Sequence, residues 1–357
     1  TDASNEGDGC RRELILNFPF KELVKIPVWP KFPATNRAGE WATQVHFLPK
    51  RVGINGRTIG AVQDSNMFIT TFAAYPYFLL DDSLLPSSQQ TITNILSLAE
   101  RSVSQYKRGD AFNFWPVLPG VRSPSPRVGP CNIPVAMLEM LGRAYINPKL
   151  AGFWTKVTRG LQAPPKYWLE QCFNTSLNPT GADALFNIPN DADDTSTAVA
   201  FQAFFSQRFP QRTVVPDAAA LSRMQAYRDI DRSKEDGRDS WKGKNTGAFL
   251  TWMKDENPPT FDSPEKGIIP LGVNNVDTVV NSNACFSLAA LAMKDMPGYQ
   301  EALCLLARAV EKKNWPESGL YYPQFMMFPY TFSRASRDGG AREGPMHAAA
   351  DKLLLDV

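Results

Sequence analysis

Residues 190–201 read Asn-Asp-Ala-Asp-Asp-Thr-Ser-Thr-Ala-Val-Ala-Phe, so three carboxylates stand directly before an apolar helical pattern. Aspartate is a favoured N-cap, and acidic residues in a first turn complement the helix dipole. The stretch therefore predicts a helix over 191–207. On that helix Asp193 and Asp194 begin two neighbouring stripes, and the sequence leaves open which of the two faces a cavity.

Helical periodicity extends outward from this stretch over most of the chain from Ile59 onward. Loops rich in proline and glycine separate five candidate helix pairs: 64–79 with 88–106, 132–146 with 149–161, 191–207 with 217–229, 274–293 with 298–313, and 322–335 with 346–355. One helix of a pair tends to be apolar with few charges, and its partner is amphipathic. Inner and outer helices of a ring require this alternation. The pattern predicts an all-α fold, an α/α toroid of five to six helical hairpins, with a sixth pair around 241–253.

The N-terminal part differs from the rest. Residues 1–57 alternate short apolar stretches with prolines and glycines, which predicts an extended arm or short strands packed on a toroid domain over 58–357. A weak internal repeat supports the helical array, because Asp194-Thr195 and Asp277-Thr278 each open a helix that continues in small and apolar residues.

Composition narrows the functional classes. The chain has 357 residues, 43% of them hydrophobic, and its 38 basic and 36 acidic residues give a formal net charge of +2. No basic field or basic cluster interleaved with aromatics is present, so nucleic acid is not expected as a partner. The longest apolar run, residues 67–80, contains Pro76 and is too short for a transmembrane segment.

Cysteine and histidine usage argues against a metal site. The five cysteines are widely spaced without a Cys-x-x-Cys pair, and Cys285 and Cys304 lie in apolar helical patterns that predict buried thiols. Only two histidines, His46 and His347, are available for a catalytic triad or a His-based metal site. We therefore expect no protein-bound metal. The disulfide pattern and the oligomeric state stay open.

The acidic cluster is the strongest candidate for chemistry. If Asp191, Asp193 and Asp194 share a poorly hydrated pocket, they cannot all ionise freely, and one becomes a candidate proton donor. Helix capping without catalysis explains the same residues. A calcium loop is a weaker alternative, because the glycine and the downstream glutamate of such loops are missing.

A second group of polar and aromatic residues is expected to line the same pocket. Asn274, Asp277 and Asn281 form a polar stripe on a helix in otherwise apolar surroundings. Buried amides and carboxylates need hydrogen bonds, so these residues either cross-link neighbouring helices or line a wet pocket, and we favour the pocket. Aromatic residues gather in two segments and can shelter a cation or hold a sugar ring. The candidate substrate-binding residues from these segments are Trp115, Tyr322, Tyr330 and Arg334.

The motif Asp191-Ala192-Asp193-Asp194-Thr195 resembles the Asp-x-Asp-Asp-Thr motif of class II terpene cyclases, the family of squalene-hopene cyclase and the copalyl diphosphate synthases. The resemblance covers about a dozen residues. It implies an α/α toroid, a hydrophobic isoprenoid substrate, and protonation of an alkene or epoxide by Asp193, with Asp191 and Asp194 as polarising neighbours. No redox cofactor is implied, and Mg²⁺ matters only if the substrate carries a diphosphate.

Two other functions stay open. A secreted toroid acting on carbohydrate would place a carboxylate pair, Asp193 with Asp277 for example, on either side of a glycosidic bond. A non-catalytic extracellular scaffold would use the acidic cluster only to cap a helix. The sequon at Asn174 and a first residue, Thr1, that is not methionine fit a secreted or lumenal protein.

Overall fold

The computed structural model describes 14 stretches of the chain: 39–41, 43–46, 53–54, 57–58, 61–64, 66–80, 85–115, 117–118, 127–128, 188–230, 245–254, 274–322, 324 and 326–357. The expected helices over 132–161, Asn174, His46 as a side chain, and most of the expected N-terminal arm lie outside this description.

The described part of the chain is mostly helical, which confirms the all-α prediction at that level. The longer helices are α2 (Met67–Phe78), α3 (Pro86–Val103), α7 (Ala192–Arg208), α8 (Ala218–Arg223), α9 (Thr278–Ala290), α10 (Tyr299–Glu311), α11 (Met327–Arg337) and α12 (Pro345–Asp356). Three short 3₁₀ turns, η1 (Ser104–Tyr106), η2 (Met224–Ala226) and η5 (Trp315–Glu317), accompany them.

The strands among the described residues form only two-stranded antiparallel pairs. The pairs are β1 (Thr43–His46) with β4 (Ala61–Asp64), β2 (Gly53–Ile54) with β3 (Arg57–Thr58), β5 (Lys107–Arg108) with β6 (Ala111–Phe112), and β7 (Val117–Leu118) with β8 (Arg127–Val128). Short strands are therefore present at the end of the expected arm.

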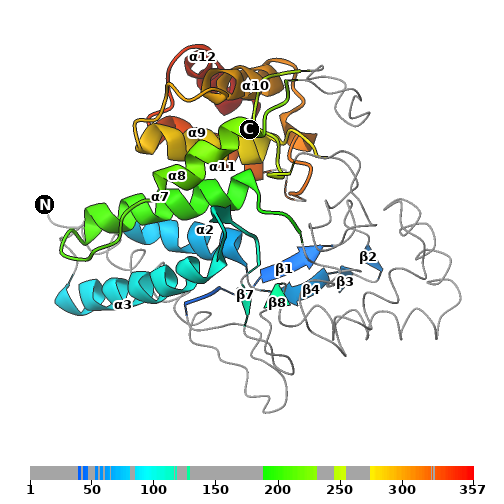
Figure 1. Cartoon of the computed structure of the whole chain (residues 1–357). Coiled ribbons are helices and arrows are strands. Elements are labelled where there is room, and N and C mark those ends of the chain that lie inside the picture. Colours follow the sequence, from blue (N-terminus) through cyan, green and yellow to red (C-terminus); the bar gives the residue numbers. More distant parts are fainter. Residues whose placement is uncertain are drawn as a thin grey trace, which may run out of the picture.

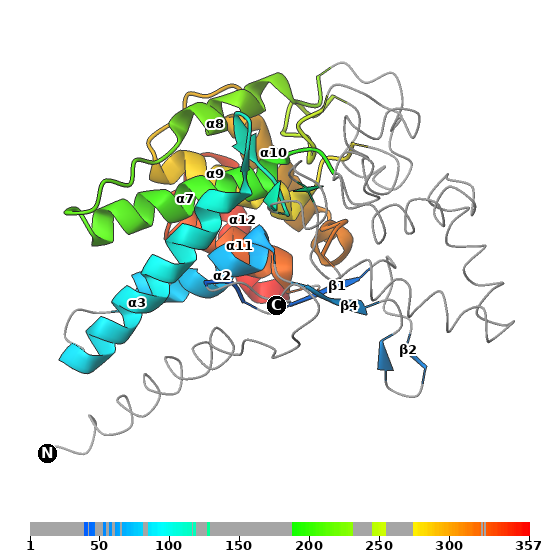
Figure 2. The ribbon, with the colours of Figure 1, turned by 60° about the horizontal axis from the view of Figure 1, so that its bottom comes forward.

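Helices that follow one another in the chain pack as pairs: α2 with α3, α7 with α8, α9 with α10, and α11 with α12. The first members also pack on one another, because α7 contacts both α2 and α9, and α9 contacts α11 (Figures 1 and 2). Their burial follows this arrangement. Helices α7 and α9 are buried on almost every side, whereas α3, α10 and α12 bury a single face.

The predictions for residues 245–254 and for Cys304 are wrong. Residues 245–254 are not helical but extended, and they form isolated bridges from Trp252 to Asp191 and from Phe249 to Arg228. The buried amides of Asn281 on α9 and of Asn274 before it hold this segment by its backbone, which a helical backbone with internally paired groups would not allow. Cys304 is exposed, because it lies on the outer face of α10; Cys285 is buried as expected.

The observed helix N-caps change which residues correspond in the predicted internal repeat. Asp191 is the N-cap of α7 and accepts from the backbone N–H of Asp194 at 2.7 Å, while Asp277 is the N-cap of α9. The structurally equivalent residues are thus Asp191 and Asp277, not Asp194 and Asp277. With this alignment Ser196 and Ser282 also correspond, and each bonds to the carbonyl four residues earlier.

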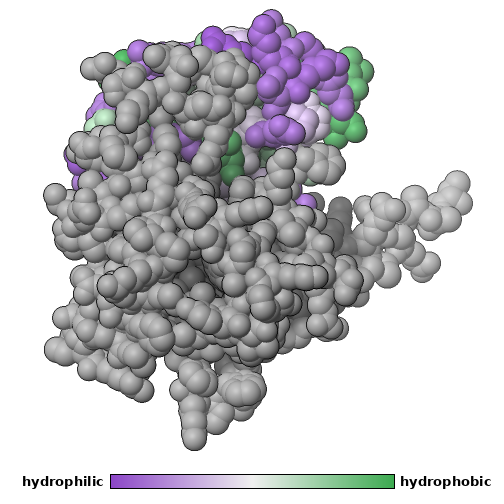
Figure 3. Space-filling view, turned by 90° about the vertical axis from the view of Figure 1, so that its right-hand side faces the viewer, coloured by the Kyte–Doolittle hydropathy of each residue, from purple (hydrophilic) through white to green (hydrophobic). Residues whose placement is uncertain are grey.

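None of the described helices is both long and apolar enough to cross a bilayer. Where the described residues reach the side face of the molecule, the surface is mostly hydrophilic with a small hydrophobic edge (Figure 3).

Candidate functional site

The N-terminal turns of α7 and α9 bring four aspartates into one buried region. Asp191, Asp193 and Asp194 are 2%, 4% and 2% exposed, and Asp277 is fully buried. The site lies at helix N-termini because short polar residues precede each apolar helix, and backbone N–H groups there stabilise negative charge. Helix α2 also stabilises negative charge here, because the backbone N–H of Phe68 bonds to the Asp194 carboxyl.

Asp191 and Asp194 form a carboxyl pair. The Oδ1 atom of Asp191 is used by the backbone N–H of Asp194, and no donor in the described part of the chain reaches Asp191 Oδ2 or Asp194 Oδ1. The two side chains bond to each other instead. Burial raises the pKa of Asp191 to about 7, and burial with the charge of Asp191 raises the pKa of Asp194 well above its usual range. The pair therefore shares a proton near neutral pH.

Asp193 faces away from this pair, toward α9 and the residues before α11. The amide of Asn283 donates to its Oδ1 atom, and the hydroxyl of Tyr322 bonds to Oδ2. Burial, and then the charges of Asp191 and Asp277, raise the pKa of Asp193, whereas Asn283 and Arg334 lower it. The balance lies well above the usual range, which favours the protonated form.

Arg334 on α11 lies in a cage of aromatic rings beside Asp193. Its guanidinium carbon is 4.1 Å from the ring centroid of Phe72, 4.6 Å from Phe286, 5.2 Å from Tyr75 and 5.8 Å from Tyr330. One terminal nitrogen donates to Asn283 Oδ1, and the side chain is 5% exposed. Aromatic faces stabilise a positive charge at this range, so the cage holds a desolvated cation.

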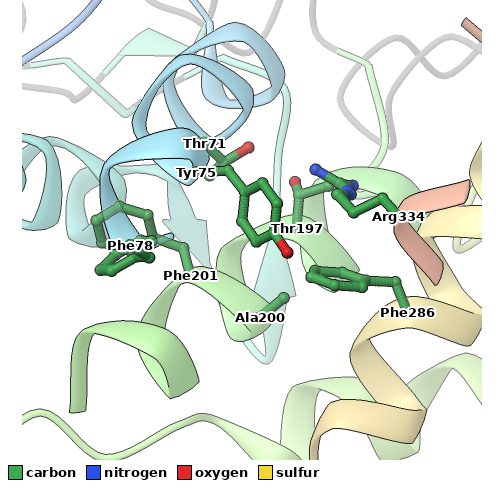
Figure 4. Close-up of a pocket in the computed structure, with 8 residues that line it drawn as sticks. All are labelled: Thr71, Tyr75, Phe78, Thr197, Ala200, Phe201, Phe286 and Arg334. Carbon is green, nitrogen blue, oxygen red and sulfur yellow. The ribbon is translucent and has the colours of Figure 1, made fainter. Parts of the chain in front are cut away.

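A small cavity adjoins Arg334, between α2, α7 and α9 (Figure 4). Tyr75 lies across its middle, with Phe78 and Phe201 on one side and Phe286 and Arg334 on the other. Thr197 and Ala200 from the stripe of Asp193 line the cavity too, and Phe201 comes from the stripe of Asp194, so both stripes reach it. The free space has room for about one water molecule.

The predicted polar stripe is buried, but only Asn281 lies within α9: Asp277 is the N-cap and Asn274 precedes it in non-helical backbone, so the prediction of a helix from Asn274 is wrong. The hydrogen bonds of these three side chains go to backbone groups. Asn274 bonds to the N–H and C=O of Trp252, and Asn281 bonds to the N–H and C=O of Phe249. Asp277 accepts from four N–H groups, of Val279, Val280, Leu320 and Tyr321. These three side chains fasten the extended segment 245–254 and the turn after η5 to the N-terminal end of α9.

The predicted aromatic residues lie in different settings. Tyr322 is half-buried and bonds to Asp193, with its ring 4.9 Å from that of Phe68. Tyr330 is 42% exposed at the edge of the Arg334 cage. Trp115 is buried after β6, in a segment whose backbone bonds to the first residues of α2 and α7.

Sequence reasoning missed Asn283 and the aromatic cage residues Phe72, Tyr75 and Phe286. Asn281 and Asn283 are two positions apart, so they point to nearly opposite sides of α9. Only Asn283 faces Asp193. The run Asn281-Ser282-Asn283 inside an apolar helical pattern could have indicated Asn283. The predicted stripe of Asn274, Asp277 and Asn281 indicated Asn281 instead. The sequence also contains a short repeat, Ala111-Phe112 to Trp115 and Ala248-Phe249 to Trp252. This repeat indicates that the two extended segments are equivalent.

Comparison with models of protein families gave no match, and comparisons with curated proteins and with solved structures gave none either. Within the described stretches, no group of three or more His, Cys, Asp or Glu side chains is placed to hold a metal ion.

Proposed function

We propose that this protein is an enzyme of the class II terpene cyclase type, which starts a carbocation reaction by protonating an isoprenoid alkene or epoxide. The observation that carries the proposal is the position of Asp193. It is a buried carboxyl held by Asn283 and Tyr322, beside the carboxyl pair of Asp191 and Asp194 and the aromatic cage of Arg334. Such surroundings keep an acid protonated until a substrate takes the proton.

The neighbouring carboxylates have a defined part in this proposal. Asp191 and Asp194 share one proton and leave a negative charge close to Asp193, which raises the pKa of Asp193. Asn283 and Arg334 work in the opposite direction and stabilise the carboxylate that forms when the proton leaves. The acid is therefore protonated at rest and still has a stabilised conjugate base.

The aromatic cage around Arg334 supports the same chemistry, because its rings already surround a positive charge. The adjoining cavity has room for only about one water molecule. The proposal accordingly places the isoprenoid on the Tyr322 side of Asp193. No cofactor is required, and Mg²⁺ enters only with a diphosphate substrate.

The arrangement of helices supports an α/α toroid as the finer description of the fold. The mostly buried helices α2, α7, α9 and α11 contact one another in turn, and Phe72 on α2 lies 5.6 Å from Tyr330 on α11. Helices α3, α10 and α12 lie outside them with one solvated face. We propose a secreted or lumenal location from the sequon at Asn174.

One observation favours a second candidate, a non-catalytic scaffold. Asp191 and Asp277 are both helix N-caps, so part of the acidic group has a sufficient structural role. Capping does not account for Asp193, whose two carboxyl oxygens bond to the side chains of Asn283 and Tyr322. The carbohydrate reading with an Asp193 and Asp277 pair gains no support, because backbone N–H groups occupy the Asp277 carboxylate.

The test is turnover of squalene, its terminal epoxide and a C20 isoprenoid diphosphate in D₂O, with mass spectrometry of the products. Solvent deuterium enters the product if a protein acid protonates the substrate. Asp193→Asn keeps the shape of the side chain and removes the acid, so turnover should vanish while the helical circular dichroism signal persists. Asp217→Asn, at the N-cap of α8, is the control, because asparagine caps equally well.

Unchanged turnover in Asp193→Asn would remove Asp193 from the mechanism. A folded wild-type protein that neither binds nor converts any of the three probes would favour the scaffold instead.

A further inference from the structure

We infer that Tyr322, not Asp193, is the group that contacts the substrate, and that it passes on the proton of Asp193 through its hydroxyl. This inference rests on the proposed function and adds a catalytic residue to it. Its basis is a continuous line of hydrogen bonds that runs from Arg334 through Asn283 and Asp193 to Tyr322.

Arg334 fixes the direction of this line. A guanidinium can only donate, so the atom of Asn283 that faces it must be the carbonyl oxygen Oδ1. The amide Nδ2 of Asn283 then faces Asp193 and donates to Oδ1 of that carboxyl. Since Oδ1 of Asp193 is an acceptor, the proton of the acid form belongs on Oδ2. The Tyr322 hydroxyl donates to Oδ2 of the carboxylate; once Oδ2 carries the proton, the phenol oxygen accepts it and the phenol proton can point to the substrate.

Solvent exposure distinguishes the two candidate proton donors, Asp193 and Tyr322. Asp193 is 4% exposed, and both of its oxygens have a hydrogen-bonding partner. Tyr322 is half-buried, and its ring packs against Phe68, which holds the hydroxyl over Asp193. Because Tyr322 keeps more exposed surface than Asp193 and its hydroxyl bonds to Oδ2, we place the substrate against the phenol.

The transfer moves two protons, one from Tyr322 to the substrate and one from Asp193 to Tyr322. The bond from Tyr322 oxygen to hydrogen breaks as a new C–H bond forms from the alkene π electrons, or a new O–H bond forms at an epoxide. The bond from Asp193 Oδ2 to hydrogen breaks at the same time, and this proton restores the phenol. The products are a substrate cation, a neutral Tyr322 and an Asp193 carboxylate. The cation ends by losing a proton to water, and water reprotonates Asp193.

Acid strength in this relay is that of the carboxyl, because the phenol is neutral before and after the step. Asn283 donates to the new carboxylate, and Arg334 polarises Asn283 and supplies the nearest positive charge. Both stabilise charge that develops only during the transfer, which lowers the barrier rather than strengthening substrate binding.

The experiment compares Tyr322→Phe, Asp193→Asn and the control Tyr77→Phe, in the full chain and with the three isoprenoid probes. Tyr322→Phe keeps the ring against Phe68 and removes only the hydroxyl, and Tyr77→Phe removes a buried hydroxyl that bonds to no described residue. The relay predicts a loss of kcat of at least about 100-fold in Tyr322→Phe, with Tyr77→Phe close to wild type. Direct donation by Asp193 predicts that Tyr322→Phe stays active.

The outcomes distinguish this inference from the proposed function. An inactive Asp193→Asn with an active Tyr322→Phe overturns the relay and leaves the proposed function in place, whereas an active Asp193→Asn overturns the proposed function.

A readout independent of turnover is the ¹³C carboxyl NMR signal of Asp193, assigned by its absence from Asp193→Asn. We expect this signal to shift in Tyr322→Phe while Asp193 remains protonated. A signal identical in wild type and Tyr322→Phe would show that the hydrogen bond does not form, and would overturn the relay.

Discussion

Thr195 on α7 and Asn281 on α9 stand four residues after their helix N-caps, and each clamps the backbone of a phenylalanine. Thr195 Oγ1 lies 3.1 Å from the N–H nitrogen of Phe112 and 3.5 Å from its carbonyl oxygen. Asn281 makes the same pair of contacts to Phe249, both at 3.0 Å. Helices α7 and α9 thus hold equivalent extended segments by the same pair of contacts, and these contacts fix the ends of the two helices that carry the aspartates.

Replacing Asn281 should therefore weaken the fold. Asn281→Ala leaves the N–H and C=O of Phe249 without their partners in a buried region, and each such loss costs about 1–3 kcal/mol. We expect the free energy of unfolding to fall by about 2–4 kcal/mol, measured by urea denaturation. Asn94→Ala, on the exposed face of α3, is the control and should change it by less than about 0.5 kcal/mol. Equal effects of the two substitutions would contradict the clamp.

The sequence predicted the long helices within a few residues because their periodicity and caps are local signals. The starts of α7 and α9 follow from Asp191 and Asp277 as N-caps. The extended form of 245–254 could not be predicted in this way. Its backbone groups bond to Asn274 and Asn281, which lie more than twenty residues further along the chain.

The acidic cluster was predictable as a site, but the hydrogen-bond partners of its carboxyl groups were not. Periodicity placed Asp193 and Asp194 on different stripes without saying which stripe faces which helix. That choice depends on how α7 packs against α9, which lets Asn283 reach Asp193 and sends Asn281 to Phe249. Likewise Arg334 was singled out from its aromatic segment, while three of its ring partners come from α2 and α9.

Gly298 should be irreplaceable at the start of α10. Its φ is +104°, and a Cβ atom there would lie 2.5 Å from the Phe249 ring, whose backbone Asn281 holds in place. Gly298→Ala should cost roughly 2 kcal/mol or more from steric overlap and left-handed strain. Gly340→Ala meets the same kind of φ, +76°, with open space around it, so we expect about 1 kcal/mol. Thermal unfolding of both variants checks the difference, and a Gly340 variant as unstable as the Gly298 variant would refute it.

Stability should fall as pH rises through the weakly acidic range. Burial raises the pKa of Asp277 to about 6 and that of Asp191 to about 7, so the folded state binds more protons than the unfolded chain above about pH 4. The contribution of each group is greatest below its unfolded pKa, declines by up to about 1.4 kcal/mol per pH unit, and levels off above the folded pKa.

The measurement is the free energy of unfolding in urea between about pH 4.5 and about pH 7.5, in wild type and in Asp191→Asn. Because asparagine also serves as an N-cap, the variant should fold while losing one titrating group. The curve of Asp191→Asn should therefore decline less steeply than that of wild type. Parallel curves would show that Asp191 does not titrate differently in the folded and unfolded states.

The charge of Arg334 should be felt by Asp193 even though Asn283 stands between them. Arg334→Met keeps most of the volume in the aromatic cage and removes the charge. Because Arg334 lowers the pKa of Asp193, that pKa should rise in the variant, as seen by ¹³C carboxyl NMR titration. Under the proposed function turnover should also fall, since the carboxylate formed on proton transfer loses its nearest positive charge.

Measurements of unfolding stability distinguish the effect of the Arg334 charge from the effect of its packing. A buried charge exchanged for an apolar side chain of similar volume is often close to neutral, so Arg334→Met should unfold within about 2 kcal/mol of wild type. Arg334→Ala opens a cavity among Phe72, Tyr75 and Phe286, which should cost about 3 kcal/mol or more. If the two variants are equally unstable, or if the pKa of Asp193 does not rise in Arg334→Met, then Arg334 acts on this cluster only through its volume, and its electrostatic part in the proposed reaction is wrong.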